Sequence, residues 1–144
     1  MWTFEHTETT SATPAQLWAR YTDPTRWPEW DHETERVTID GPFAAGTTGT
    51  LKPVKGPKTK FRMLEVTPFE GFSDVSRLPL ARLTFTHRLQ KAADGTRFTH
   101  AVSITGLLSP VFARVIGANI AAGLPAAMRR LAGLAEQTPA SEAA

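Results

Sequence analysis

The hydrophobic and polar residues of this chain alternate over most of its length and change to a helical spacing only near the end. Between Arg82 and Lys91, the alternate positions hold apolar residues and His87, and the segment Thr96–Thr105 repeats the pattern around His100. Such alternation predicts strands with one buried face. Asp94-Gly95 between them is typical of a hairpin turn, so we expect the two strands to pair with their apolar faces on the same side.

Shorter alternating segments predict further strands at residues 2–10, 32–39, 47–54, 59–67 and 72–78. With the hairpin, they would make a curved antiparallel sheet of about seven strands. After the first strand, Thr13, Pro14 and Gln16 give the signals of a capped helix over residues 14–21. A second short helix is expected over residues 24–30, packed by its tryptophans.

From Ser109 to Gln137 the spacing becomes helical. The apolar residues that recur there every three or four positions are Phe112, Ile116, Ile120, Leu124, Met128 and Leu131. This long amphipathic helix would measure roughly 40 Å. Pro125 and the nearby glycines predict a kink at residues 121–125. Residues 138–144 are expected to form a flexible tail, which leaves residues 1–137 as one domain.

Composition narrows the classes of protein that the chain can belong to. A length of 144 residues fits a single domain with a sizeable core. The absence of cysteine excludes disulfides and thiolate metal sites. A net charge of +2 neither requires nor forbids an anionic partner. The first residues show no secretory pattern, and we see no run of about 18 uninterrupted apolar residues, so we expect a cytoplasmic protein without stable membrane insertion.

The order of the elements, one strand, two short helices, about six strands and a long helix, predicts an α+β fold with the helices segregated from the sheet. Several sequence marks accompany this order. They are Thr13-Pro14-Ala15-Gln16-Leu17-Trp18, Asp23-Pro24, Trp27-Pro28-Glu29-Trp30-Asp31, Gly95-Thr96-Arg97-Phe98-Thr99-His100, Ser103-Ile104-Thr105-Gly106, Gly123-Leu124-Pro125 and Leu131-Ala132-Gly133-Leu134-Ala135-Glu136. With them, nearly the whole chain resembles the START-like helix-grip superfamily (SRPBCC), and within it the bacterial polyketide cyclase/dehydrase-type proteins.

The resemblance implies a ligand cavity between the concave face of the sheet and the long C-terminal helix. The superfamily includes aromatase/cyclases, lipid carriers and hormone receptors, and it has no shared catalytic motif to transfer to this chain. A fold by itself does not set the function.

His87 and His100 are the most informative polar residues, because each lies on the apolar face of its strand. We expect them to be direct or diagonal neighbours across the hairpin. Two imidazoles at a pocket could share a proton, bind a ligand carbonyl or act as acid and base. The alternative is that each is a buried or rim histidine satisfied by a neighbour. No third ligand accompanies them, so neither a metal nor another cofactor is expected.

The expected cavity lining combines these histidines with apolar residues of the sheet and the helices. It consists of Trp30, Phe61, Met63, Phe85, His87, His100, Val102, Ile116, Ile120 and Leu124. Which face of strand 59–67 lines the cavity stays open, because both faces carry apolar residues. Glu65 shares the parity of Phe61 and Met63 and would be an inward carboxylate unless the register shifts.

Two further surfaces bear on possible partners. Five basic residues between Lys52 and Arg62 have no interleaved aromatic residues, so we interpret them as a solvated hairpin tip and expect no nucleic-acid partner. The alanines and glycines of the long helix could leave room for a ligand or permit close packing in a homodimer. The sequence does not separate these two possibilities.

Two functions follow. The first is a binding module that holds a small, largely apolar molecule such as a lipid or a polyketide. The alternative is a polyketide cyclase, aromatase or dehydratase in which His87 or His100 moves protons, with Arg62 or Glu65 assisting. A shaped, dry pocket accelerates ring closure by proximity alone, so such an enzyme needs little dedicated machinery.

Overall fold

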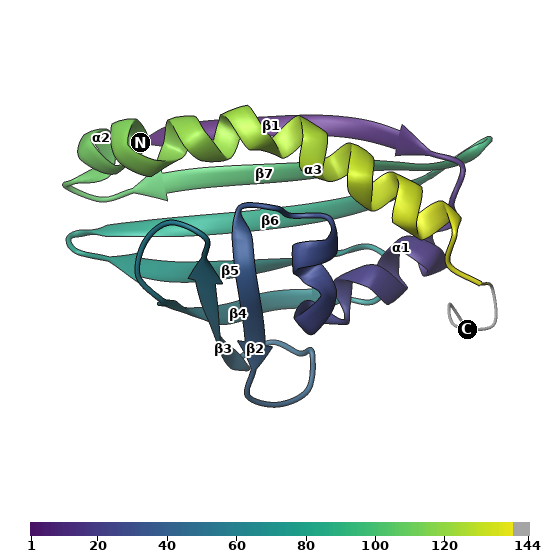
Figure 1. The fold of residues 1–144 in the computed structure, drawn as a ribbon, viewed down its shortest axis with the longest axis horizontal. Coiled ribbons are helices and arrows are strands. Elements are labelled where there is room, and N and C mark those ends of the chain that lie inside the picture. The colour runs from purple at the N-terminus through teal and green to yellow at the C-terminus, as the bar shows by residue number, and fades with distance from the viewer. Residues whose placement is uncertain (140–144) are drawn as a thin grey trace.

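A computed structural model describes residues 1–139 of the chain, and within them the strands form one antiparallel sheet in the order β1-β7-β6-β5-β4-β3-β2 (Figure 1). The strands are β1 (Trp2–Thr10), β2 (Thr34–Ile39), β3 (Thr48–Pro53), β4 (Thr59–Thr67), β5 (Gly71–Leu78), β6 (Ala81–Ala92) and β7 (Gly95–Thr105). This is the curved sheet of about seven strands that the alternation predicts. Together with the long C-terminal helix, it confirms the helix-grip fold.

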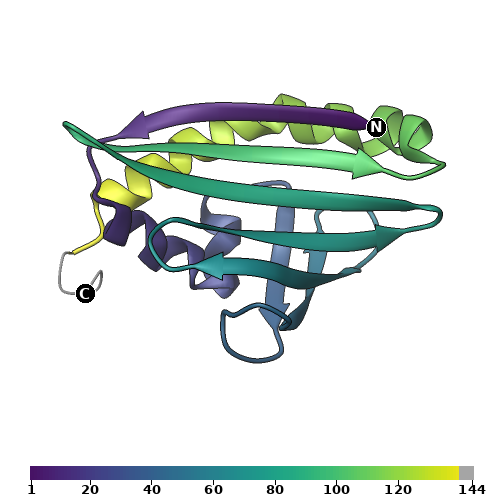
Figure 2. The same ribbon diagram turned by 180° about the vertical axis from the view of Figure 1, so that it is seen from behind.

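The sheet curls so that β2 and β3 run across the direction of the longer strands, while the C-terminal helix lies along β1 and β7 (Figure 1). The view from behind shows the opposite face of the sheet, which no helix of the described residues covers (Figure 2). The face that the helix covers, called the inner face below, is therefore the one that can hold a buried site.

Two short helices follow β1 and close one end of the molecule, as expected. In α1 (Pro14–Tyr21), the Gln16 amide donates to the Thr13 hydroxyl at 3.2 Å, and the Thr13 amide donates to the Gln16 side chain at 2.8 Å. This reciprocal pair is the predicted capping box. The 3-10 helix η1 (Pro24–Glu29) comes next. Its Trp27 is buried, with its ring stacked on Phe72 of β5.

The long helix contains an irregular turn that the sequence did not predict. It starts as α2 (Ser109–Phe112), passes through a π-helical turn η2 (Ala113–Gly117) and continues as α3 (Ala118–Glu136). The helix runs without a break through residues 121–125, where the kink is expected. The irregular turn includes Gly117, whose backbone lies against the Trp2 ring: a Cβ there would be 3.1 Å from it.

The two halves of this helix differ in burial. Between Ser109 and Ala126 only Ser109 and Gly117 are buried, whereas α3 buries Ala127 and four further residues beyond it. By length and composition alone, the helix Ser109–Glu136 is apolar enough to cross a membrane, although its apolar residues are interrupted by polar ones. The buried core helix of a soluble protein satisfies the same criterion, and 17% of the apolar window of this helix is buried.

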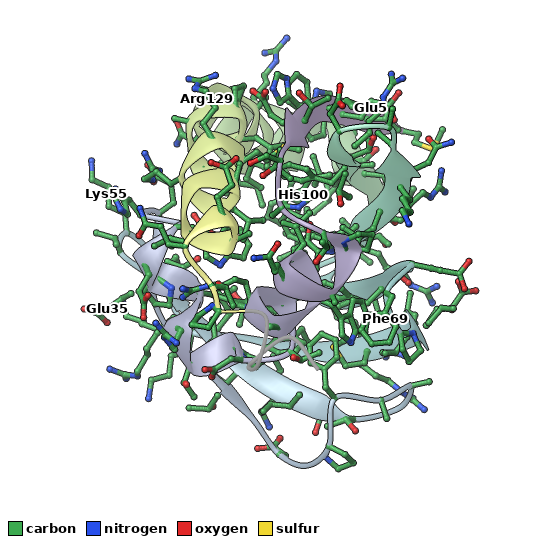
Figure 3. The ribbon with its side chains drawn as sticks, turned by 90° about the vertical axis from the view of Figure 1, so that its right-hand side faces the viewer. Glu5, Glu35, Lys55, Phe69, His100 and Arg129 are labelled. Carbon is green, nitrogen blue, oxygen red and sulfur yellow. The ribbon has the colours of Figure 1, made fainter. Side chains whose placement is uncertain are left out.

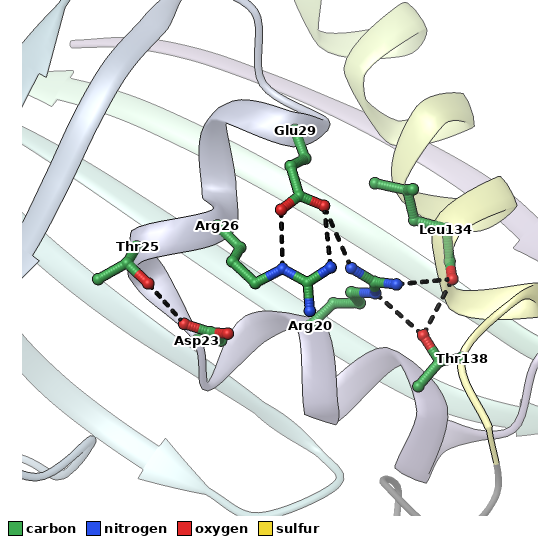
Figure 4. A network of polar contacts seen from close by, with 7 residues as sticks. All are labelled: Arg20, Asp23, Thr25, Arg26, Glu29, Leu134 and Thr138. Atoms are coloured by element: carbon green, nitrogen blue, oxygen red, sulfur yellow. Dashed lines mark hydrogen bonds and ion pairs between the residues drawn. The ribbon is translucent and has the colours of Figure 1, made fainter.

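The end of the helix is fixed to α1 by polar contacts (Figure 4). Thr138, where we expected a flexible tail to begin, is buried. Its hydroxyl accepts from Arg20 Nε at 2.9 Å and donates to the Leu134 carbonyl at 2.9 Å, and its own carbonyl accepts from Gln16 Nε2 at 2.7 Å. The packed chain thus extends past residue 137, and residues 140–144 of the expected tail lie outside the described residues.

Candidate functional site

Three strands place three histidines in one row on the inner face. His100 of β7 is directly opposite His87 of β6 and His6 of β1. Ala92 pairs with Gly95, so Ala93 and Asp94 form the turn and His87 lies directly opposite His100, which is one of the two arrangements expected. Both rings are buried, and Figure 3 shows His100 between the long helix and the sheet, away from surface residues such as Glu5 and Lys55.

The His87 and His100 rings are held in an aromatic environment. The Tyr21 hydroxyl and His100 Nε2 share a hydrogen bond of 2.6 Å, and the His87 ring stacks on Phe72 with 4.0 Å between the ring centroids. Burial lowers the pKa of His87 to about 3, which the backbone of Phe72 opposes weakly. Burial and then the neighbouring histidines lower the pKa of His100. Near neutral pH both imidazoles are therefore uncharged.

The inner face is divided into two hydrophobic clusters. The first lies beneath α1, η1 and the second half of α3, and it includes Trp18, Tyr21, Trp30, Phe72 and Met128, all buried. Its aromatic rings pack edge to face or stacked. The rings of Trp27 and Phe72, for example, are stacked with 5.9 Å between their centroids. This end of the interior is a filled core.

The second cluster lies beneath the first half of the long helix, and many of its side chains are only half buried. They are Trp2, Phe4, Leu78, Phe85, Phe112, Ile116 and Ile120, packed around buried Leu83, Val102 and Ile104. Phe85 points to the inner face of a central strand, where a closely covering helix would bury it. These side chains are therefore partly accessible, and we call this half-buried apolar region of the inner face the open cleft.

Asp74 marks the boundary between the two clusters. It is 7% exposed and stands on the inner face of β5, opposite Met63 of β4 and Phe85 of β6. Burial raises the pKa of its carboxyl to about 7. The sequence pattern alone did not single out this residue. Asp74 shares the parity of Phe72, but Ser76 on the same face leaves that face too polar in sequence to be recognised as buried.

Two buried polar side-chain atoms lack partners among the described residues. The indole Nε1 of Trp30 and the Nδ1 of His87 are buried and have no hydrogen bond. Buried polar atoms without partners are rare in native structures, and water or a ligand usually accounts for them.

The structure places the other predicted residues as follows. Phe61, Met63 and Val102 are buried on the inner face, and Leu124 is half buried against the filled core. The predicted lining is therefore shared between the filled core and the open cleft. Enclosed space around the histidines was expected, but two hollows of about 430 and 560 Å³ lie elsewhere and are lined by neither histidine.

Arg62 and Glu65 do not reach the inner face. A β-bulge between Met63 and Glu65 shifts the register, so Glu65 is exposed although its parity matches that of Phe61. Arg62 is exposed as well. Neither side chain is placed to assist His87 or His100. Within residues 1–139, no three His, Cys, Asp or Glu side chains are placed to hold a metal ion.

The fold and the cleft define a helix-grip domain with an accessible inner face. Residues 1–136 match the family model described as polyketide cyclase / dehydrase and lipid transport, and the chain belongs to this family. No curated protein matches the chain.

Solved structures share the fold at low sequence identity. Protein MLL2253 from Mesorhizobium loti is 24% identical, with 96% of this chain and 99% of that chain covered and a TM-score of 0.76. Norcoclaurine synthase from Thalictrum flavum, solved with dopamine and hydroxybenzaldehyde, is 16% identical. The match covers 96% of this chain and 88% of that chain, with a TM-score of 0.71. The di-domain ARO/CYC StfQ from the steffimycin biosynthetic pathway is 12% identical. The match covers 94% of this chain and 50% of that chain, with a TM-score of 0.76.

Proposed function

We propose that this chain binds a small, largely apolar molecule in the open cleft, between the inner face of the sheet and the first half of the long helix. The half-buried state of Phe85 carries this proposal, because an apolar side chain on a central strand is left accessible beneath a helix. Phe4, Ile116 and Ile120 offer apolar surface around it. Small-molecule sites are mostly apolar with a few polar groups, as here. The family description, which includes lipid transport, supports the same class of guest.

The alternative, a cyclase that uses His87 and His100 as acid and base, has less support from the geometry. An efficient proton-transfer group has a pKa near the working pH, and burial moves the pKa of both rings far below neutrality. The bond to Tyr21 and the stack on Phe72 instead give both histidines a structural role in the core.

The proposal can be tested by blocking the cleft. The first measurement is a titration with Nile red, an uncharged dye whose fluorescence rises in apolar surroundings. We expect saturable binding by the wild type. Ile116→Trp should weaken it at least about tenfold, because the indole would occupy the cleft. Val115→Trp is the matched control, since Val115 is 60% exposed on the neighbouring helix position.

Two outcomes would overturn the proposal. One is the absence of saturable binding by a folded wild-type protein. The other is equal dye affinity in wild type, Ile116→Trp and Val115→Trp, which would place the dye elsewhere on the surface. Native mass spectrometry of protein purified from its host would then show whether an apolar molecule accompanies the wild type and is lost from Ile116→Trp.

A further inference from the structure

Among the carboxyl groups that the structure describes, that of Asp74 is buried on the inner face without compensation from the protein. Its side chain lies between Met63 and Phe85 across the sheet and is almost fully buried. Within residues 1–139 it has neither a hydrogen bond nor an ion pair, whereas Asp31, the other carboxyl whose pKa burial raises, accepts from Thr34 at 2.8 Å. An unpaired buried carboxylate is costly, and such groups gather at functional sites.

Within the described sheet, no cation is placed to pair with it. Strand alternation puts every arginine of β4 to β7 on the outer face, where all are exposed: Arg62, Arg77, Arg82, Arg88 and Arg97. The other carboxylate at an inner-face position, Glu8, is already paired with His6 at 2.9 Å and Arg129 at 3.5 Å. No cation of the described sheet therefore pairs with Asp74, and a cationic guest would be the first partner for its carboxylate.

The surroundings of Asp74 suit an organic cation with an apolar body. Phe85 is directly opposite, and Phe72 lies two residues earlier on the same face. Aromatic faces attract cations, and an ammonium–carboxylate pair is strong where water is scarce. The half-buried side chains of the open cleft would cover the rest of such a molecule.

We propose that the molecule bound in the open cleft is an apolar amine, whose ammonium group pairs with the carboxylate of Asp74. This inference rests on the proposed binding function and names the chemical class of the guest. His87 stands opposite Phe72, two residues from Asp74 on the same face, and its unpartnered Nδ1 offers a further polar contact to the guest.

The experiment compares two probes of nearly equal shape, 2-(2-naphthyl)ethylamine and the neutral 2-(2-naphthyl)ethanol, by calorimetry at pH 8. We expect the wild type to bind the amine at least about tenfold more tightly than the alcohol. Asp74→Asn should reduce this preference to within about twofold and leave the affinity for the alcohol nearly unchanged. Asp40→Asn, at an exposed carboxyl, is the matched control and should keep the preference.

Different results would contradict the proposal of an amine guest and the proposal of a binding function. If the alcohol binds but the amine is not preferred, or the preference persists in Asp74→Asn, the amine proposal is wrong while the cleft remains a binding site. If neither probe binds and Nile red shows no saturable binding, the proposed binding function itself is wrong. Circular dichroism checks the fold of each variant, and Asp74→Ser replaces Asp74→Asn if the amide does not fold.

Discussion

Two kinds of buried ionisable residue share the inner face, and burial moves their pKa values in opposite directions. Desolvation disfavours the charged form, so it lowers the pKa of His87 and His100 and raises that of Asp74. All three groups therefore tend toward their neutral forms in the folded protein. Of the three, only Asp74, with a pKa of about 7, changes its charge near neutral pH.

This shift predicts a pH dependence of stability that Asp74→Asn removes. The folded-state pKa of Asp74 is above its unfolded value of 3.8. Its favourable contribution is therefore fully present below about pH 4 and is lost as the pH rises to about 7. Relative to Asp74→Asn, the wild type should lose on the order of 4 kcal/mol of unfolding free energy over this range, as an upper bound.

Urea denaturation of both proteins at several pH values between 4 and 8 measures this difference. Protonation of His87 and His100 destabilises the fold as the pH falls below about 6.5, but both proteins share that effect, so it cancels in the comparison. A difference in stability that stays constant with pH would show that Asp74 titrates normally in the folded state.

At the level of residues, the sequence predicts the histidine pair and misses the carboxyl. His87 and His100 alternate with large apolar residues, which identifies their face without ambiguity. In β5, Ser73, Val75 and Arg77 alternate with Phe72, Asp74 and Ser76, so neither face is clearly apolar. Glu65 is misplaced for a different reason, because one extra residue in the bulge reverses its side, and alternation cannot reveal a bulge.

At the level of elements, turn glycines and helix glycines have opposite effects on stability. Gly95 has φ of +144°, and a Cβ there would collide with the Thr10 carbonyl oxygen at the end of β1. A Cβ at Gly133, within α3, would extend into open space, with no neighbouring atom within 4 Å. The hairpin therefore requires glycine at position 95, whereas α3 does not require it at position 133.

We expect Gly133→Ala to stabilise the protein by about 0.5–1 kcal/mol, because alanine restricts the unfolded chain and favours the helix. Gly95→Ala should destabilise it by more than about 2 kcal/mol, because the backbone conformation is strained and β1 has to move. Thermal and urea unfolding of the two variants measure both values. A stable Gly95→Ala protein would mean that the turn has another accessible conformation.

Element positions are predicted well where local signals are strong. The capping box at Thr13 fixes the start of α1, and Asp94-Gly95 correctly locates the last hairpin, although the turn itself is formed by Ala93 and Asp94. The kink predicted from Pro125 stays a prediction, whereas the π-helical turn at Ala113–Gly117 has no local signal in the sequence. The π-helical turn coincides with contact between Gly117 and Trp2, residues far apart in the sequence.

For the whole molecule, the burial pattern predicts unequal stability along the long helix. Residues 127–136 are packed on β1 and α1, and Thr10 donates to Glu136 at 2.6 Å. Residues 109–120 cover the open cleft with half-buried side chains. Few buried contacts permit local opening.

Amide hydrogen exchange followed by NMR tests this. We expect residues 127–136 to exchange at least about tenfold more slowly than residues 113–120. Saturation with a bound apolar amine should slow exchange in the first half and leave the second half nearly unchanged. Uniform protection along the helix without ligand would contradict the division into a packed half and an open half.

The contacts of Thr138 with Arg20 and Gln16 have a consequence for the proposed binding space. A helix that is fastened at its C-terminal end can pivot there, and a pivot displaces the far end most. The space would then widen as a wedge, narrow beside Asp74 and broad toward Phe112. A guest would enter amine first from the Phe112 end, and a longer apolar body would lift the start of the helix without disturbing the core beneath α1.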